Sequence, residues 1–179
     1  MGYNGEPSIF DHMTPDDIIF AFFPCTRFEA QILLSFWGQA NQDKKLSDID
    51  KLERDLRLHK ELHENYELIT KLAIIVLRKG LRMVFENPAG EQHYLTRYWC
   101  LKPAIIDKDR RDNGDAFKKP TQYWFIGFEP KFNLVFEPID FVENKRVCKS
   151  GLSQRERSEI HPQYARRFIK QHILQEGNT

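Results

Sequence analysis

The sequence lacks the features that mark secreted, membrane-spanning and metal-binding proteins. Its three cysteines are scattered without close spacing, which argues against a disulfide framework and against a zinc site, and suits a reducing compartment. The longest apolar runs, such as Ile18 to Phe23, are far too short to cross a bilayer. No basic segment followed by an apolar stretch opens the chain, so we expect no secretory signal, no membrane partner and a cytoplasmic location.

An excess of charge of one sign is also lacking, since the formal net charge is +1. The charges are nevertheless unevenly placed. Residues 1–24 include four acidic residues and no lysine or arginine, whereas residues 145–172 include eight lysines and arginines and two glutamates. Such a basic face can contact phosphates, although a solvated helix face gives the same pattern. At 179 residues, 41% of them hydrophobic, the chain fits a single domain over residues 1–179.

The first half of the chain predicts a strand, a long helix and a second strand. The apolar run Ile18 to Phe23, stopped by Pro24, is typical of a strand buried on both faces. From Ser47 to Lys79, apolar residues recur every three or four positions, which indicates one amphipathic helix or two in succession, closed by Gly80. A second apolar strand then ends at Glu86. This order forces the two strands to be parallel.

The second half is less regular and predicts a mixed sheet. We expect strands over Gln122–Phe128 and Leu134–Phe136, and a closing helix over Glu159–Gln175 that Pro162 can start. The fold class is therefore α/β. We expect a partial Rossmann-like, methyltransferase-type sheet with flanking helices.

Cys25 and Glu86 are the two residues most suited to chemistry. Both follow predicted parallel strands, at the edge where open α/β sheets bind ligands. A cysteine there can serve as a nucleophile, although a lone cysteine is more often a small apolar filler. The apolar surroundings of Val84 and Phe85 favour the protonated form of the Glu86 carboxyl, which can then donate a proton. The alternative is that Glu86 only forms bonds with backbone amides or an arginine.

Four motifs in order resemble the DNA carbon-5 cytosine methyltransferases, and most closely a compact, phage-like branch of that family. Two of the motifs are short and contain Cys25 and Glu86, respectively. They are Phe23-Pro24-Cys25-Thr26 and Phe85-Glu86-Asn87-Pro88. The others are Lys119-Pro120-Thr121-Gln122-Tyr123-Trp124 and the closing segment Arg157-Ser158-Glu159-Ile160-His161-Pro162-Gln163-Tyr164-Ala165. The similarity spans about residues 16 to 174, nearly the whole chain.

The resemblance implies a specific reaction. The Cys25 thiolate attacks carbon 6 of a flipped-out cytosine, and Glu86 holds or protonates ring nitrogen 3. Carbon 5 then takes a methyl group from S-adenosylmethionine. The resemblance further places Pro24, Asn87 and Pro88 on the cofactor side. We expect DNA contacts from Lys119, Thr121, Arg155 and Arg157. If they have no such role, Lys119 and Thr121 are ordinary loop residues, and the two arginines belong to a solvated face.

The family's Gly-rich cofactor loop has no counterpart before the first strand, where Gly2 and Gly5 do not form it. We therefore expect the cofactor-binding half to be supplied in trans, by a longer chain or through oligomerisation.

An alternative is a non-catalytic, DNA-binding remnant of a prophage methylase. A cysteine-dependent hydrolase is disfavoured because no histidine lies near either strand end in the sequence. His59 and His63 lie four residues apart, but a solvated helix face explains them better than a metal site.

Overall fold

The computed structural model describes residues 4–23, 25, 27–29, 36–38, 40, 43–143 and 158–174. Within them, four strands form one open sheet in the order β1-β2-β4-β3. The strands are β1 (Ile18–Phe22), β2 (Arg82–Pro88), β3 (Ile105–Asp107) and β4 (Thr121–Ile126). β1 and β2 are parallel, whereas β4 is antiparallel to both β2 and β3. The expected α/β class, the parallel pair and the mixed second half are thus confirmed.

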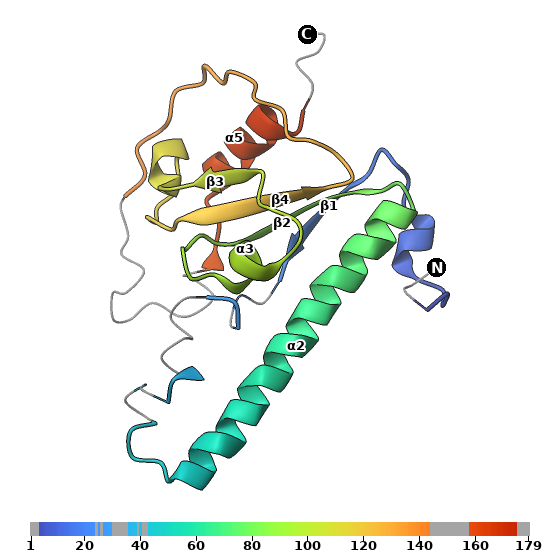
Figure 1. The fold of residues 1–179 in the computed structure, drawn as a ribbon. Coiled ribbons are helices and arrows are strands. Elements are labelled where there is room, and N and C mark those ends of the chain that lie inside the picture. Colours follow the sequence, from blue (N-terminus) through green and yellow to red (C-terminus); the bar gives the residue numbers. More distant parts are fainter. Residues whose placement is uncertain are drawn as a thin grey trace.

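The helical elements connect and cover this sheet. They are the short 3-10 helices η1 (Ile9–His12) and η3 (Arg110–Asn113), and the helices α2 (Asp48–Arg78), α3 (Tyr94–Tyr98) and α5 (Pro162–His172). Figure 1 shows α2 and α3 on one face of the sheet and α5 on the other. The molecule therefore has three layers, and each face of the sheet has its own core.

The predicted segment 47–79 is one continuous helix of 31 residues, α2. The Ser47 hydroxyl caps its start by accepting from the backbone N–H of Asp50, and Gly80 follows its end at φ 65°. The buried side chains of α2 run from Leu58 to Val76, whereas residues 48–57 bury none. Accordingly the first turns of α2 project beyond the sheet (Figure 1).

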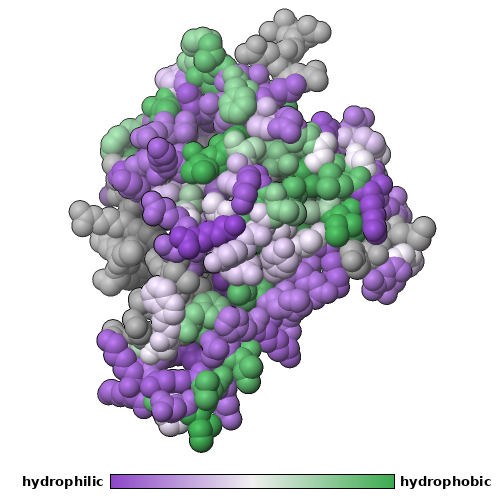
Figure 2. All heavy atoms as spheres, viewed as in Figure 1, coloured by the Kyte–Doolittle hydropathy of each residue, from purple (hydrophilic) through white to green (hydrophobic). Residues whose placement is uncertain are grey.

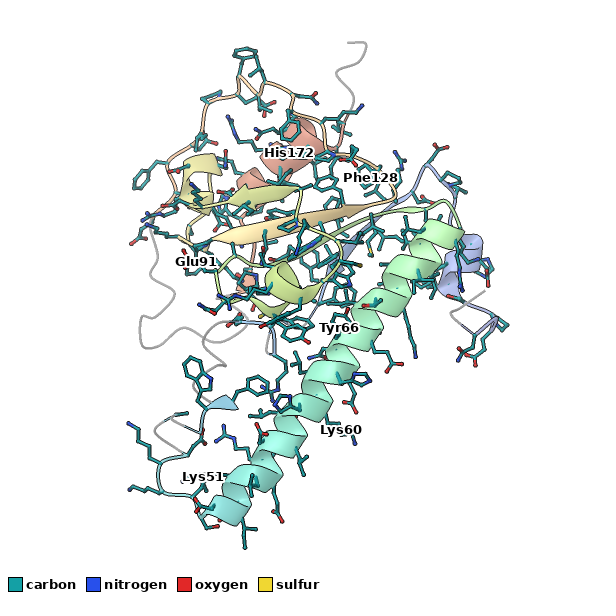
Figure 3. The ribbon with its side chains drawn as sticks, in the orientation of Figure 1. Lys51, Lys60, Tyr66, Glu91, Phe128 and His172 are labelled. Atoms are coloured by element: carbon teal, nitrogen blue, oxygen red, sulfur yellow. The ribbon has the colours of Figure 1, made fainter. Side chains whose placement is uncertain are left out.

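Side chains alternate between the two faces along β2, as the strand geometry requires. Met83 and Phe85 belong to the core under α2, and Val84 belongs to the core under α5. Tyr66, labelled in Figure 3, points from α2 toward α3 and meets the ring of Tyr94 edge-on at 6.1 Å. The two cores are thus separated by the sheet itself.

An aromatic stack fills the α2 side of the sheet. The rings of Phe85 and Trp124 lie parallel with centroids 4.6 Å apart, and Trp99 meets Phe85 edge-on at 5.4 Å. Both indoles are buried and donate hydrogen bonds, Trp99 to Thr70 Oγ1 and Trp124 to the carbonyl of Leu101. The third tryptophan, Trp37, is 61% exposed.

Several predicted bounds differ in the structure. β1 ends at Phe22 rather than Phe23, and α5 spans Pro162–His172 within the predicted Glu159–Gln175. β2 does not end at Glu86 but continues to Pro88, because β4 supplies an antiparallel ladder for these last residues. β4 ends at Ile126 rather than Phe128, since Gly127 takes φ 83° and a Cβ there would collide with the carbonyl oxygen of Leu81. Leu134–Phe136 is extended but pairs with no strand among the described residues.

Candidate functional site

Cys25 and Glu86 lie at the carboxyl end of the parallel strand pair, Cys25 just after β1 and Glu86 within β2. Glu86 is paired in register with Phe22, the last residue of β1, and Cys25 follows three residues later. The Cys25 carbonyl accepts hydrogen bonds from the N–H groups of Phe28 at 2.9 Å and Glu29 at 3.3 Å. Cys25 therefore opens a helical turn directly after β1.

The Cys25 thiol is half-buried and protonated in its resting state. Burial raises its pKa to about 12, and a hydrogen bond to the Glu29 carboxylate acts in the same direction. The Lys119 ammonium partly opposes both effects. Among the described residues no histidine takes part in this shift, so the thiol lacks the histidine partner that a cysteine hydrolase requires.

The Glu86 side chain lies on the α5 side of the sheet. Burial raises its pKa above the ordinary value of 4.5, and the charges of Lys119 and Arg110 oppose that rise. Its Oε2 atom is buried and has no hydrogen-bond partner among the described residues. A buried carboxyl oxygen without a partner is costly for a fold and favours a role in binding a ligand.

One pair of charged residues acts on both groups. The Lys119 ammonium lowers the pKa of Cys25 and of Glu86, and the Glu29 carboxylate raises both. Cys25, Glu86, Lys119 and Glu29 therefore share one electrostatic environment, although they come from three separate stretches of the chain.

An apolar pocket of about 210 Å³ adjoins Glu86. From the sheet it is lined by Phe20, Ala21, Phe22, Val84, Glu86 and Tyr123, and from the α5 side by Ile160, Tyr164, Ala165, Phe168 and Ile169. This volume is below the range of about 300–1,000 Å³ that holds drug-sized ligands, and it suits a single ring.

Two of the residues that line this pocket, Tyr123 and Tyr164, are joined by their hydroxyls. The Tyr164 hydroxyl donates to Asp107 Oδ2 at 2.9 Å and lies 2.8 Å from the Tyr123 hydroxyl, which must therefore be the donor in that second bond. Burial raises the pKa of both tyrosines. The fully buried Arg110 lies over the Tyr164 ring at 4.9 Å and forms an ion pair with Asp115. Both tyrosine hydroxyls are therefore uncharged, and the contacts of Tyr164 with Asp107 and Arg110 fix its position.

Comparisons with protein-family models, with curated proteins and with solved structures find no match to this chain. Arguments about function therefore rest on the geometry of the site and on its chemistry.

The predicted cofactor residues are distributed over both faces of the sheet. Asn87 is buried on the α2 side, opposite to Glu86, where its Oδ1 lies 3.1 Å from His93 Nε2 and its Nδ2 donates to the Glu86 carbonyl. Burial lowers the pKa of His93 to about 4, so this imidazole is neutral. Pro88 ends β2, and its carbonyl accepts from Gln122. Pro24 lies outside the described residues.

The predicted DNA-contacting residues differ in accessibility. Lys119 is half-buried and acts on both Cys25 and Glu86. Thr121 is fully buried, and its hydroxyl donates to the Lys119 carbonyl. Arg155 and Arg157 lie outside the described residues.

Sequence reasoning missed Glu29, Arg110, Tyr123 and Tyr164. Glu29 lies four residues after Cys25, the spacing of neighbours on one helical turn, and this was an available signal. Nothing in the sequence pairs Arg110 with Tyr164, because their contact is made across 54 residues of the chain.

Two further findings concern the described residues as a group. They include no group of three or more histidines, cysteines, aspartates or glutamates that could hold a metal ion. His59 and His63 instead lie beside Asp55 and Glu67 on the exposed side of α2. None of the described helices combines the length and apolar character needed to cross a membrane.

Proposed function

We propose that this chain is the nucleophile- and base-binding part of a DNA cytosine methyltransferase that acts on carbon 5 of a cytosine turned out of the duplex. One observation carries the proposal: the Cys25 thiol, just after β1, and the Glu86 carboxyl, at the end of the parallel β1–β2 pairing, are both under the influence of the Lys119 charge. The β1-α2-β2 unit supports a partial Rossmann-like sheet of the methyltransferase type, with β3 and β4 as its mixed part.

Glu86 is suited to the ring of a pyrimidine. Burial raises the pKa of its carboxyl, which favours the protonated form, and its Oε2 has no hydrogen-bond partner among the described residues. A neutral carboxyl can donate that proton to ring nitrogen 3 as a nucleophile adds to the ring. The apolar pocket beside it matches one unstacked base in size, and removing a base from the stack costs only a few kcal/mol.

Cys25 supplies the nucleophile. Its sulfur forms a bond to carbon 6, its proton passes to the Glu29 carboxylate that it already contacts, and ring nitrogen 3 takes the proton of Glu86. The ring remains neutral, and carbon 5 becomes an electron-rich enamine carbon. Lys119 stabilises the carboxylate that Glu86 becomes.

The proposed methyl donor is S-adenosylmethionine, and the described residues do not form a site that fits it. The pocket at Glu86 is too small for a nucleoside joined to an amino acid, and Asn87 is already bonded to His93 on the other face. We infer that another segment or subunit holds the cofactor. The outer edge of β1 suits such a partner, since β1 ends the described sheet and exposes 63% of Phe22.

The covalent step can be tested without the cofactor. DNA that contains 5-azacytosine carries a ring nitrogen that makes carbon 6 more electrophilic, so thiol addition gives an adduct without methyl transfer. We expect a denaturing gel to show the chain joined to this DNA, and Cys25→Ala to abolish the band. Cys100→Ala removes an exposed cysteine and should leave the adduct unchanged. An adduct that persists in Cys25→Ala contradicts the proposal.

The high pKa of Cys25 favours a second candidate, a DNA-binding protein without catalysis. At pH 7 a thiol with a pKa of about 12 is almost entirely protonated. This candidate predicts DNA binding that weakens with salt, forms no adduct and is unaffected by Cys25→Ala. The same gel and a binding titration in 50 mM and 200 mM salt therefore separate the two functions.

A further inference from the structure

Residues 130–138 form an extended segment with an exposed apolar row. The segment follows β4, and the exposure of its side chains alternates from Phe132 to Phe136. Phe132, Leu134 and Phe136 are 71%, 73% and 88% exposed, whereas Asn133 and Val135 between them are half-buried. Figure 2 shows apolar side chains at the crest of this segment, at the opposite end of the molecule from the start of α2. Large side chains exposed in a row indicate an interaction surface.

One backbone edge of the segment is bonded to α5. The N–H groups of Lys131 and Asn133 donate to the carbonyls of His172 and Gln171, at 2.8 and 2.9 Å. Arg167 donates to the carbonyls of Val135 and Glu137. Figure 3 labels His172 on α5, where its ring also meets Phe132 at 5.7 Å. These contacts hold the segment against the helix.

The other backbone edge is free. The N–H and C=O groups of Phe132, Leu134 and Phe136 have no hydrogen-bond partner in the part of the chain that the structure describes. In an extended chain, alternate residues direct these groups to opposite edges. The free groups therefore form one continuous edge that can accept another strand.

The segment is nearly a palindrome about Leu134. Its sequence is Pro130-Lys131-Phe132-Asn133-Leu134-Val135-Phe136-Glu137-Pro138. A proline stands at each end, a charged residue of opposite sign follows inside each proline, and a phenylalanine follows inside each charge. Two copies aligned antiparallel thus place unlike charges and like apolar groups opposite one another.

We propose that residues 130–138 are an edge strand through which two copies of this chain pair antiparallel about Leu134. Leu134 then faces the partner's Leu134, and Phe132 faces the partner's Phe136. These are the residues with free backbone groups, and each such pair exchanges two N–H···O bonds. Pro130 and Pro138 lack an N–H and end the ladder on both sides.

Charge selects this register over its alternatives. Lys131 lies opposite the partner's Glu137, whose carboxylate is 53% exposed although Lys170 also contacts it. A parallel pairing would instead place Lys131 near the partner's Lys131 and the two Glu137 carboxylates together, which is unfavourable. The antiparallel register also joins two apolar rows into one buried strip.

Sedimentation velocity over a range of concentrations tests the interface. We expect the unmodified chain to dimerise and Leu134→Lys to weaken dimerisation about 100-fold or more, because two ammonium groups then meet in an apolar contact. Leu56→Lys is the matched control, since Leu56 on α2 is also 73% exposed. A chain that stays monomeric, or a dimer that Leu134→Lys does not weaken, overturns the proposal. So does a dimer that is lost only in Leu56→Lys.

A charge exchange tests the register. Lys131→Glu should weaken the dimer about 10-fold, because the new carboxylate faces the partner's Glu137. Adding Glu137→Lys restores opposite charges and should recover most of the loss. A double variant that dimerises more weakly than Lys131→Glu alone overturns the antiparallel register.

Cross-linking tests the position of the symmetry axis. In a background with Cys25, Cys100 and Cys148 replaced by serine, Leu134→Cys should form an intermolecular disulfide on mild oxidation, since facing residues have Cα atoms about 5.5 Å apart. Phe132→Cys should form none, because it faces the partner's Phe136. The reverse pattern overturns the proposal.

Discussion

At the scale of single residues, the two faces of β2 hold buried titratable groups with opposite tendencies. The pKa of Glu86 on the α5 side is raised, and the pKa of His93, which contacts Asn87 on the α2 side, is lowered. Both shifts have the same cause, since burial disfavours the charged form of either group.

Glu86→Gln tests the first of these shifts through stability. The stabilisation from holding the Glu86 proton is fully present below pH 4.5, the ordinary value, and is lost as pH rises through the raised value of the folded state. Glutamine keeps the shape and cannot ionise. We therefore expect the wild type to lose stability relative to Glu86→Gln as the pH rises above 4.5, measured by urea unfolding. Parallel stability curves for the two proteins would contradict the raised pKa.

His93→Gln tests the second shift, with the opposite sign. The pKa of His93 is lowered from 6.5 to about 4, so its contribution to stability is present above pH 6.5 and is lost as pH falls toward 4. The full effect is on the order of 3 kcal/mol. Glutamine can still donate to Asn87 but does not titrate in this range. We expect the variant to lose less stability than the wild type from pH 6.5 to 4 in the same measurement, and an equal loss would refute this assignment.

At the scale of elements, α2 is a helix of two unequal parts. Its buried residues begin at Leu58, and the preceding turns bury no side chain. Helix propensity alone gives marginal stability, and tertiary packing provides most of the remainder. The two parts should therefore differ in how readily they open.

Amide hydrogen exchange measures that difference. We expect amides of residues 58–78 to be protected close to the level of global unfolding, and amides of residues 52–57 to exchange at least 10-fold faster. The first four residues are excluded because their N–H groups have no partner within the helix. Uniform protection along α2 would show that its projecting turns are held by contacts that the described residues do not include.

The sequence predicts an element well where the spacing of its hydrophobic residues agrees with the residues that mark its start and end. The apolar run at Ile18, the three- and four-residue steps of α2 and the helix start at Pro162 each gave an element of the expected type. The end of β2 was wrong because a strand that arrives 33 residues after Pro88 extends its ladder. Segment 134–136 has strand alternation without a strand partner, and a local pattern does not reveal whether a partner exists.

The candidate site was predictable only in part for the same reason. Strand order placed Cys25 and Glu86 together, since both follow from local patterns and from the geometry of a parallel unit. Because neighbouring side chains of a strand point to opposite faces, the Asn87 side chain points to the α2 side when Glu86 faces α5. The contribution of Arg110 and Tyr164 depends on packing between distant segments, which no single-sequence pattern encodes.

At the scale of the whole molecule, the sheet divides the interior into two cores that share few contacts. Ile69 belongs to the core under α2, and Phe168 belongs to the core under α5. Substitutions in separate cores should add, whereas substitutions within one core should couple.

Double-variant cycles check this division. Ile69→Val and Phe168→Leu should each cost about 1 kcal/mol and should add within about 0.5 kcal/mol when combined. Phe168→Leu combined with Tyr164→Phe is the contrasting pair, because these rings stack on α5 with centroids 6.4 Å apart, and it should depart from additivity by more. Strong coupling between Ile69 and Phe168 in urea unfolding would argue against two separate cores.

The positions of the three tryptophans give the molecule a built-in optical probe. Trp99 and Trp124 are shielded and hydrogen-bonded within the stack on Phe85, so a dissolved quencher such as acrylamide has little access to them. Trp37, at 61% exposure, lies in water and emits at longer wavelength. The quenchable, red-shifted part of the fluorescence therefore reports on the surroundings of Trp37, and the unquenched part reports on the sheet. Changes around Trp37 and unfolding of the core can thus be followed separately in one unlabelled sample.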